Sequence, residues 1–86
     1  MFRIDKSQRG GRVTLTLAGV LDAGAVVETG NAMVGPLRQN RKLILDLSEL
    51  RHADREGILF LAAAMRIEVR LTGVPRYIRL WLRFER

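Results

Sequence analysis

The strict alternation in residues 12–19, "RVTLTLAG", is the feature that most constrains the fold. Val13, Leu15 and Leu17 are apolar, and threonines stand between them. A period of two places the three apolar side chains on one face of a β-strand and the threonines on the other face. Since only one face is apolar, the pattern predicts a sheet that is covered on one side only.

The residues before this strand predict its partner. The stretch "FRIDKS" is followed by "QRGG", in which Gly10 and Gly11 adjoin the alternating strand. Glycine adopts the positive φ angles that a tight reversal requires. The first part of the chain therefore predicts a β-hairpin.

The hydrophobic period changes after Asp22 and predicts a helix. Apolar residues and glycine then recur at spacings of three and four, at Val26, Val27, Gly30, Met33, Val34 and Leu37. Asp22 is placed as the N-cap, and the helix is expected to run to about Asn40. Three glycines weaken it and Pro36 lies in its last turns, so we expect a kink or an early end near Val34.

The next segment, "KLILDLSEL", predicts a central strand. Its continuous apolar run, residues 43–45, is typical of a strand that is buried on both faces, and the strand is expected to end at Asp46. A turn is expected between Ser48 and Asp54. The following residues, "REGILFLAAAM", predict a helix whose apolar side holds Ile58, Leu61, Ala62 and Met65.

The remaining residues predict one more strand and one more helix. In residues 66–72 apolar and mostly charged side chains alternate, which is typical of an edge strand with a charged outer face. Gly73 ends this strand, and Pro75 opens a final helix, "PRYIRLWLRFER". The order β-β-α-β-α-β-α predicts an α/β domain with a mixed four-stranded sheet and helices mainly on one face.

Length and composition exclude several classes of protein. With 86 residues the chain is expected to be a single domain, residues 1–86. It has no cysteine and one histidine, His52, so we expect no disulfide, no metal site and no bound cofactor. No nucleophile–base pair, paired carboxylates or phosphate-binding loop can be assembled, so we expect no enzyme and no catalytic residues.

The N-terminal sequence, "MFRIDKSQRGG", is charged within three residues and contains no apolar leader segment. No apolar run approaches the roughly 18–20 residues that a membrane-spanning helix requires. We therefore expect a soluble, cytoplasmic protein.

Several segments together resemble a known family. In chain order they are "GVLDAG", "LILDLSEL", a turn with the pattern Asp-x-x-Gly, an apolar helix, and "VRLTGVPRYIRLWL". From about Val13 to Phe84, this ordered set resembles the STAS domain, the fold of bacterial anti-sigma-factor antagonists. The resemblance implies a cytoplasmic, non-catalytic module that regulates transcription by binding another protein.

The turn before the second helix departs from that family. In STAS regulators it reads Asp-Ser-Ser-Gly or Asp-Thr-Ser-Gly, and a partner kinase phosphorylates the serine before the glycine. Here it reads Asp54-Arg55-Glu56-Gly57, so both hydroxyl residues are replaced. Ser48 is the nearest serine, and it belongs to the preceding segment. The resemblance therefore implies a module that is not switched by phosphorylation at the usual position.

Three interpretations of this turn remain open. In the first interpretation Glu56 mimics the phosphorylated, off state of the family. A phosphoserine carries roughly −1.5 to −2 charges near neutral pH, and a glutamate permanently supplies about half of that. Alternatively, Arg55 and Glu56 form a fixed charged patch for a different partner. In the third interpretation Asp54 is a helix N-cap, and Glu56 interacts with the helix dipole, a contribution of about 0.3–1 kcal/mol.

Two further residues are associated with this turn, Asp22 through the family resemblance and His52 through its place in the sequence. Asp22 matches the aspartate of the family's G-x-L-D segment, which implies a place on the partner-facing surface together with residues 54–57; its other interpretation is a helix cap. His52 precedes the turn, and histidine is the residue type that can switch its charge near neutral pH, yet a single histidine in a loop is more often simply exposed.

The last helix carries an arginine stripe. Arg76, Arg79, Arg83 and Arg86 are spaced three, four and three apart, which places them in one band of a helix. Most of the remaining circumference is apolar, a wider arc than one sheet face requires: Tyr77, Ile78, Leu80, Trp81, Leu82 and Phe84. This helix is interpreted as core packing with solvated arginines, as an interface for a partner or a second copy, or as a surface for lipid or nucleic acid.

The chain has a formal net charge of +6, which favours anionic partners. Nucleic acid is not the leading expectation, because no binding signature with interleaved aromatic residues accompanies the charge. The resemblance implies a protein partner of one of two kinds. The first is a kinase-like anti-sigma factor. The second is a membrane lipid transporter, since small STAS subunits are attached to such transporters and need no phosphate acceptor.

Overall fold

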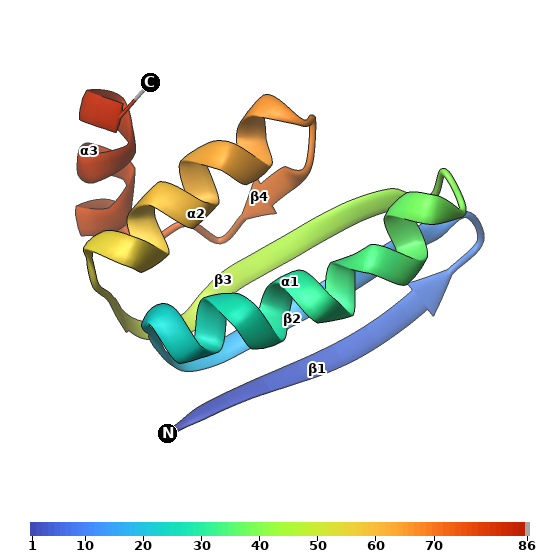
Figure 1. Ribbon diagram of the computed structural model, residues 1–86, viewed down its shortest axis with the longest axis horizontal. Helices are drawn as coiled ribbons and strands as arrows, with labels where there is room; N and C mark the ends of the chain where they lie inside the picture. The colour runs from blue at the N-terminus through green and yellow to red at the C-terminus, as the bar shows by residue number, and fades with distance from the viewer. Residues whose placement is uncertain (86) are drawn as a thin grey trace.

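The computed structural model describes residues 1–85 and contains four strands and three helices (Figure 1). The predicted order β-β-α-β-α-β-α is confirmed. The elements are β1 (Phe2–Arg9), β2 (Arg12–Leu21), α1 (Ala23–Arg38), β3 (Lys42–Ala53), α2 (Arg55–Arg66), β4 (Arg70–Thr72) and α3 (Arg76–Glu85).

The strands form one mixed sheet in the order β1-β2-β3-β4. β1 and β2 pair antiparallel as the predicted hairpin, while β2–β3 and β3–β4 are parallel pairs. In the register of β2 and β3, Val13 lies opposite Leu43 and Leu15 lies opposite Leu45. Because side chains alternate along each strand, this register brings the apolar rows of both strands to the same face.

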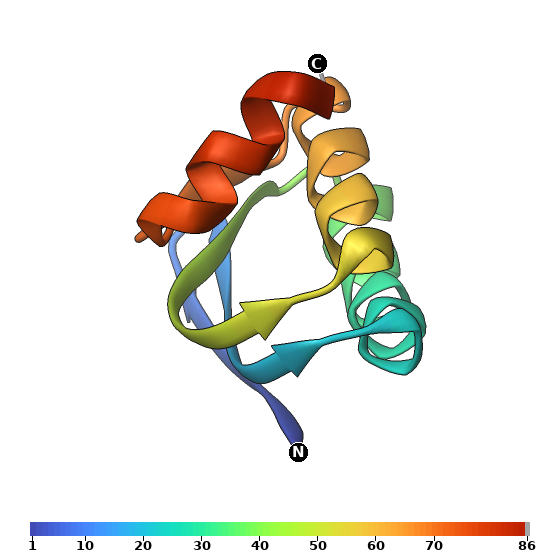
Figure 2. The same cartoon turned by 90° about the vertical axis from the view of Figure 1, so that its left-hand side faces the viewer.

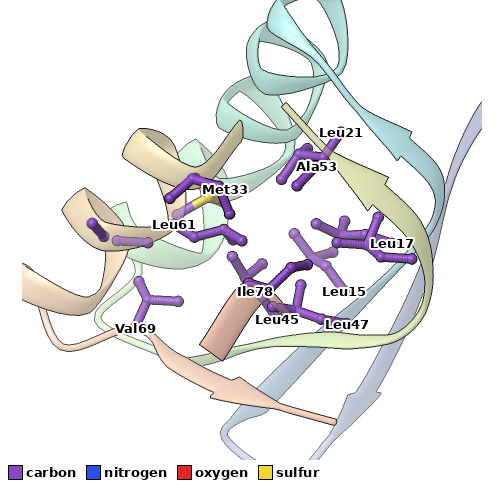
Figure 3. Close-up of a cluster of buried hydrophobic side chains, with 14 of the residues drawn as sticks. Leu15, Leu17, Leu21, Met33, Leu45, Leu47, Ala53, Leu61, Val69 and Ile78 are labelled. Atoms are coloured by element: carbon purple, nitrogen blue, oxygen red, sulfur yellow. The ribbon is translucent and has the colours of Figure 1, made fainter. Parts of the chain in front are cut away.

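All three helices cover that apolar face, and one core results (Figure 3). Leu15 and Leu45 of the sheet are buried, and each helix contributes a buried residue above them: Met33 from α1, Leu61 from α2 and Ile78 from α3. The threonines of β2 are on the opposite face and are partly exposed. The sheet is therefore covered on one side, as the alternation in β2 predicts.

The first helix does not end early, so that part of the prediction is wrong. α1 continues past Val34 to Arg38 with Pro36 inside it, and Met33 and Pro36 are both buried. A proline in the last turn removes one hydrogen bond, but burial of this face keeps the chain helical. The end is then closed by N–H groups of Gln39 and Arg41, which donate to the carbonyls of Gly35 (3.1 Å) and Pro36 (3.0 Å).

The third strand is longer than predicted. β3 extends to Ala53 instead of ending at Asp46, and residues 49–53 pair with the second half of β2. Two register shifts interrupt this pairing, so the buried positions become Leu47, Leu50 and Ala53. A spacing of three is not the strand period, which explains why the sequence pattern indicated a turn here.

The fourth strand is shorter than predicted. α2 includes Arg66, Ile67 is its C-cap, and β4 contains only residues 70–72. The N–H groups of Ile67 and Val69 both donate to the Ala64 carbonyl, and Glu68 has a φ of 67°, so the chain reverses where an extended strand was expected. The edge position of β4 is confirmed.

The last helix begins one residue later than predicted. α3 starts at Arg76, and Pro75 lies just before it, with its carbonyl accepting a hydrogen bond from the Arg79 N–H at 3.0 Å. Proline suits this position because it has no N–H to leave unpaired at a helix start.

Candidate functional site

The site is built where two parallel strands end and two helices begin. Leu21, the last residue of β2, lies opposite Ala53, the last residue of β3, and the Asp54 N–H donates to the Leu21 carbonyl at 3.2 Å. Parallel strands present their carboxyl ends at the same edge of a sheet. The first turns of α1 and α2 therefore lie side by side at this edge (Figure 2).

An aspartate caps each of these two helices, α1 and α2. The Asp22 Oδ1 atom accepts a hydrogen bond from the Ala25 N–H at 2.9 Å, and the Asp54 Oδ1 atom accepts one from the Gly57 N–H at 3.0 Å. Both caps have extended backbone angles, as N-cap residues do. The structure thus brings Asp22 and Asp54 to one edge and gives each a capping role.

Gly57 allows α2 to approach the end of β2 closely. A Cβ atom built on Gly57 would overlap the Leu21 carbonyl oxygen and would lie 3.1 Å from Leu21 Cγ and 3.3 Å from Ala53 Cβ. The carbonyl belongs to the sheet and cannot move aside without breaking strand pairing. A glycine is required here by the packing of the helix on the sheet.

Arg55 and Glu56 lie on the exposed side of the same turn. Glu56 is the acidic residue of the first turn of α2, where a negative charge interacts favourably with the helix dipole. Among the described residues, Glu56 makes no side-chain hydrogen bond and no ion pair. Its carboxylate is therefore presented to solvent.

A hollow of about 280 Å³ adjoins this turn. It is lined by His52, Ala53, Asp54, Arg55, Ile58 and Trp81. The sequence pattern assigned Trp81 to the apolar arc of the last helix, as a possible interface residue, and the structure brings it beside Asp54 and Arg55. No local spacing links residues 54 and 81, so this contact surface was missed from sequence.

His52 lies in β3, not in a loop as predicted. Its ring is stacked on Tyr77 of α3, with the ring centroids 6.2 Å apart and an angle of 11° between the ring planes. Burial raises the pKa of the Tyr77 phenol, while the backbone of Ala53 acts more weakly in the opposite direction. The hydroxyl is buried and has no hydrogen-bond partner of good geometry among the described residues.

The arginine stripe is exposed on α3. Arg76, Arg79 and Arg83 are solvent-exposed, and Arg86 lies outside the described residues. Of the apolar residues of this helix, Ile78 and Leu82 are buried in the core, while Leu80, Trp81 and Phe84 are 50%, 53% and 83% exposed. The apolar arc is thus only partly used for packing within the chain.

Residues 1–85 contain no cluster of three or more histidine, aspartate or glutamate side chains arranged to hold a metal ion. Within the same residues, none of the helices combines the length and the apolar character that crossing a membrane demands.

Neither a protein-family model nor a curated protein sequence matches the chain. Several solved structures do match it. The anti-sigma-factor antagonist SpoIIAA in its unphosphorylated form matches with a TM-score of 0.72 and 22% identity, over 98% of this chain and 83% of SpoIIAA. A protein named Mglu matches with a TM-score of 0.70 and 25% identity over 84% of this chain, which spans only 19% of Mglu.

A third match is a protein from Shewanella loihica PV-4, of the DUF3478 family and described as having a SpoIIAA-like fold. It has a TM-score of 0.57 and 10% identity over 81% of this chain and 61% of that protein. These matches and the observed topology place the chain in one fold class. It has the SpoIIAA-like fold, which is that of a STAS domain, as the sequence resemblance implied.

Proposed function

We propose that the chain is a non-catalytic protein-interaction module similar to anti-sigma-factor antagonists. It binds a regulatory partner through the edge formed by Asp22 and residues 54–57, together with the following helix, α2. The SpoIIAA-like fold supports the general class. The partner of first choice is a kinase-like anti-sigma factor.

The observation that carries this proposal is the exposed Glu56 carboxylate in the first turn of α2. In the sequence resemblance it matches the family's phosphorylated serine, and its side chain makes no hydrogen bond or ion pair among the described residues. A fixed negative charge at this place presents about half the charge of a phosphate. The module is therefore proposed to hold one binding state permanently, without a phosphorylation cycle.

The absence of a hydroxyl residue in the turn also favours a second candidate. STAS subunits of membrane lipid transporters need no phosphate acceptor, and residues 54–57 contain neither serine nor threonine. In that case the same edge docks constitutively on a transporter subunit. The two candidates share the surface and differ in the partner.

Affinity capture from native lysate tests both candidates. The bait is the wild-type chain beside Glu56→Ser, which restores the hydroxyl, and Glu28→Ser, which removes an exposed glutamate of α1 as a matched control. Bound proteins are identified, and phosphate on each bait is measured. We expect wild type and Glu28→Ser to retain the same protein, and Glu56→Ser alone to gain phosphate if that protein is a kinase.

Capture of a transporter subunit by all three baits, without phosphate on any of them, supports the second candidate. The proposed surface is wrong if Glu56→Ser and Glu56→Lys retain the same proteins in the same amounts as wild type. The whole proposal fails if the wild-type chain retains no specific protein.

A further inference from the structure

Three strips of side chains run along α3, one buried and two exposed. With 3.6 residues per turn, Ile78 and Leu82 form the strip that is buried in the core. The next strip consists of the exposed arginines 76, 79 and 83. Beyond it lie Leu80 and Phe84, 50% and 83% exposed. The arginines are therefore bordered by apolar side chains that have no place in the core.

The arginines surround a shallow hollow. Arg76, Arg79 and Arg83 line a depression of about 290 Å³, together with Leu80. None of the three forms an ion pair with a side chain that the structure describes. Guanidinium groups around one hollow suit a phosphate group, because each offers several N–H donors to its oxygens.

We propose that this surface of α3, namely Arg76, Arg79, Leu80, Arg83 and Phe84, binds membranes that contain anionic phospholipids. A lipid phosphate occupies the hollow between the arginines, and Leu80 and Phe84 enter the boundary between headgroups and acyl chains. This is the arrangement of a helix that lies in the membrane interface without crossing it. The surface is separate from Glu56 and does not depend on the function proposed for that residue.

Charge and shape favour a lipid surface over three other possible binding partners: a second copy of the chain, a nucleic acid and another protein. A second copy related by a two-fold axis would bring arginines against arginines, which is repulsive. A nucleic acid would neutralise the arginines but leave Leu80 in water. A protein would need a concave acidic pocket to fit a convex helix at the corner of the molecule (Figure 2), whereas a fluid lipid surface adapts to it.

Vesicle binding tests the proposal directly with the full chain. Sedimentation with phosphatidylcholine vesicles is compared with sedimentation with vesicles that also contain phosphatidylglycerol. Trp81 is the only tryptophan and is half exposed on the same helix, so its fluorescence emission reports contact with lipid. We expect binding and a blue shift with the anionic vesicles and neither with phosphatidylcholine alone, and binding should weaken as salt rises.

Two double charge reversals distinguish binding through this surface from an effect of the protein's net charge. Each basic side chain at an anionic membrane contributes about fivefold to binding, so Arg79→Glu with Arg83→Glu should weaken it at least about 25-fold. The control, Arg9→Glu with Arg12→Glu, makes the same change in net charge at the hairpin end of the sheet, far from α3 (Figure 1). It should change binding by less than about fivefold, because salt screens distant charges.

The apolar part is tested by Leu80→Gln with Phe84→Gln. Both side chains are exposed, so the fold should be retained, and far-UV circular dichroism checks this. We expect vesicle binding to fall about tenfold or more, because the apolar area that entered the lipid is lost.

The proposal is overturned if anionic vesicles do not sediment the wild-type chain, or if the control reversals weaken binding as much as the α3 reversals. Retention of short single-stranded DNA that is lost with Arg79→Glu and Arg83→Glu but unaffected by the glutamine changes would identify a nucleic-acid surface instead.

Discussion

The two strand-to-helix junctions have the same cap but different first turns. Asp22 and Asp54 each accept a hydrogen bond from the third helical residue, at 2.9 and 3.0 Å. α1 then begins with Ala-Gly-Ala and has no acidic residue in its first turn, whereas α2 begins with Arg-Glu-Gly. Since α1 forms with its aspartate alone, the charges of α2 are not needed to start a helix.

The junctions also differ in packing. The third helical residue is Ala25 in α1 but Gly57 in α2, because only the second helix presses on the last carbonyl of β2. In addition, the second junction is partly covered by α3, through His52 on Tyr77 and through Trp81. The first turn of α2 is thus held firmly against the sheet while Arg55 and Glu56 face solvent.

The largest effect is expected for the glycines of the two first turns. Gly57→Ala should lower the free energy of unfolding by about 2–3 kcal/mol, because the new methyl group overlaps the Leu21 carbonyl. Gly24→Ala should leave it unchanged or raise it by up to about 1 kcal/mol, since the nearest atom, Asp22 Oδ1, lies 3.6 Å away. Urea denaturation measures both. Equal effects would mean that α2 packs no closer to the sheet than α1 does.

The two aspartate caps should contribute equally to the free energy of unfolding. Asp22→Ala and Asp54→Ala should each lower the free energy of unfolding by about 1 kcal/mol, and serine at either position should restore most of it, because its hydroxyl can accept the same hydrogen bond. A much larger loss at Asp54 than at Asp22, measured by the same urea titrations, would show that the two junctions are not matched.

Neutralising Glu56 should have a smaller effect on folding. Glu56→Gln keeps the shape of the side chain and removes its interaction with the helix dipole, so the free energy of unfolding should fall by about 0.5 kcal/mol or less. Adding salt should reduce the difference further, since the group is exposed. A loss above about 1 kcal/mol would make Glu56 a structural residue.

Tyr77, which covers the second junction, should show its effect only at high pH. Burial raises the pKa of its phenol in the folded state, so the unfolded chain loses this proton first as the pH rises past about 10, and the free energy of unfolding then falls. Tyr77→Phe should be within about 0.5 kcal/mol of wild type near neutral pH, because the buried hydroxyl has no well-oriented hydrogen-bond partner in the described part of the chain. Above pH 10 the variant should lose stability less steeply; parallel curves would contradict this.

The sequence predicts those parts of the fold that depend on local patterns. The alternation around Leu15 predicts the covered face, and the two aspartates before apolar periodic segments predict where α1 and α2 begin. The second half of β3 could not be predicted, because its register shifts place Leu50 and Ala53 at a spacing that no strand pattern has. The end of α2 was missed for a related reason, since Ile67 and Val69 alternate within a turn.

The candidate site was predictable in its chain segment but not in its surroundings. Asp54 and Gly57 are recognisable from the spacing of the turn, and Asp22 from the segment after β2. Their common edge depends on the parallel pairing of β2 and β3, and the position of Trp81 depends on how α3 crosses α2. Such contacts between distant segments leave no signal in a single sequence.

The most direct test of the claim that the first turn of α2 serves binding and not folding is a pair of charge reversals. Glu56→Lys and Glu28→Lys reverse exposed glutamates of α2 and α1, and each variant is measured by urea denaturation and by quantitative capture of the proteins that wild type retains. We predict that both unfold within about 1 kcal/mol of wild type, and that only Glu56→Lys loses about tenfold or more of the captured protein. Undiminished capture by Glu56→Lys, or an equal loss with Glu28→Lys, would contradict it.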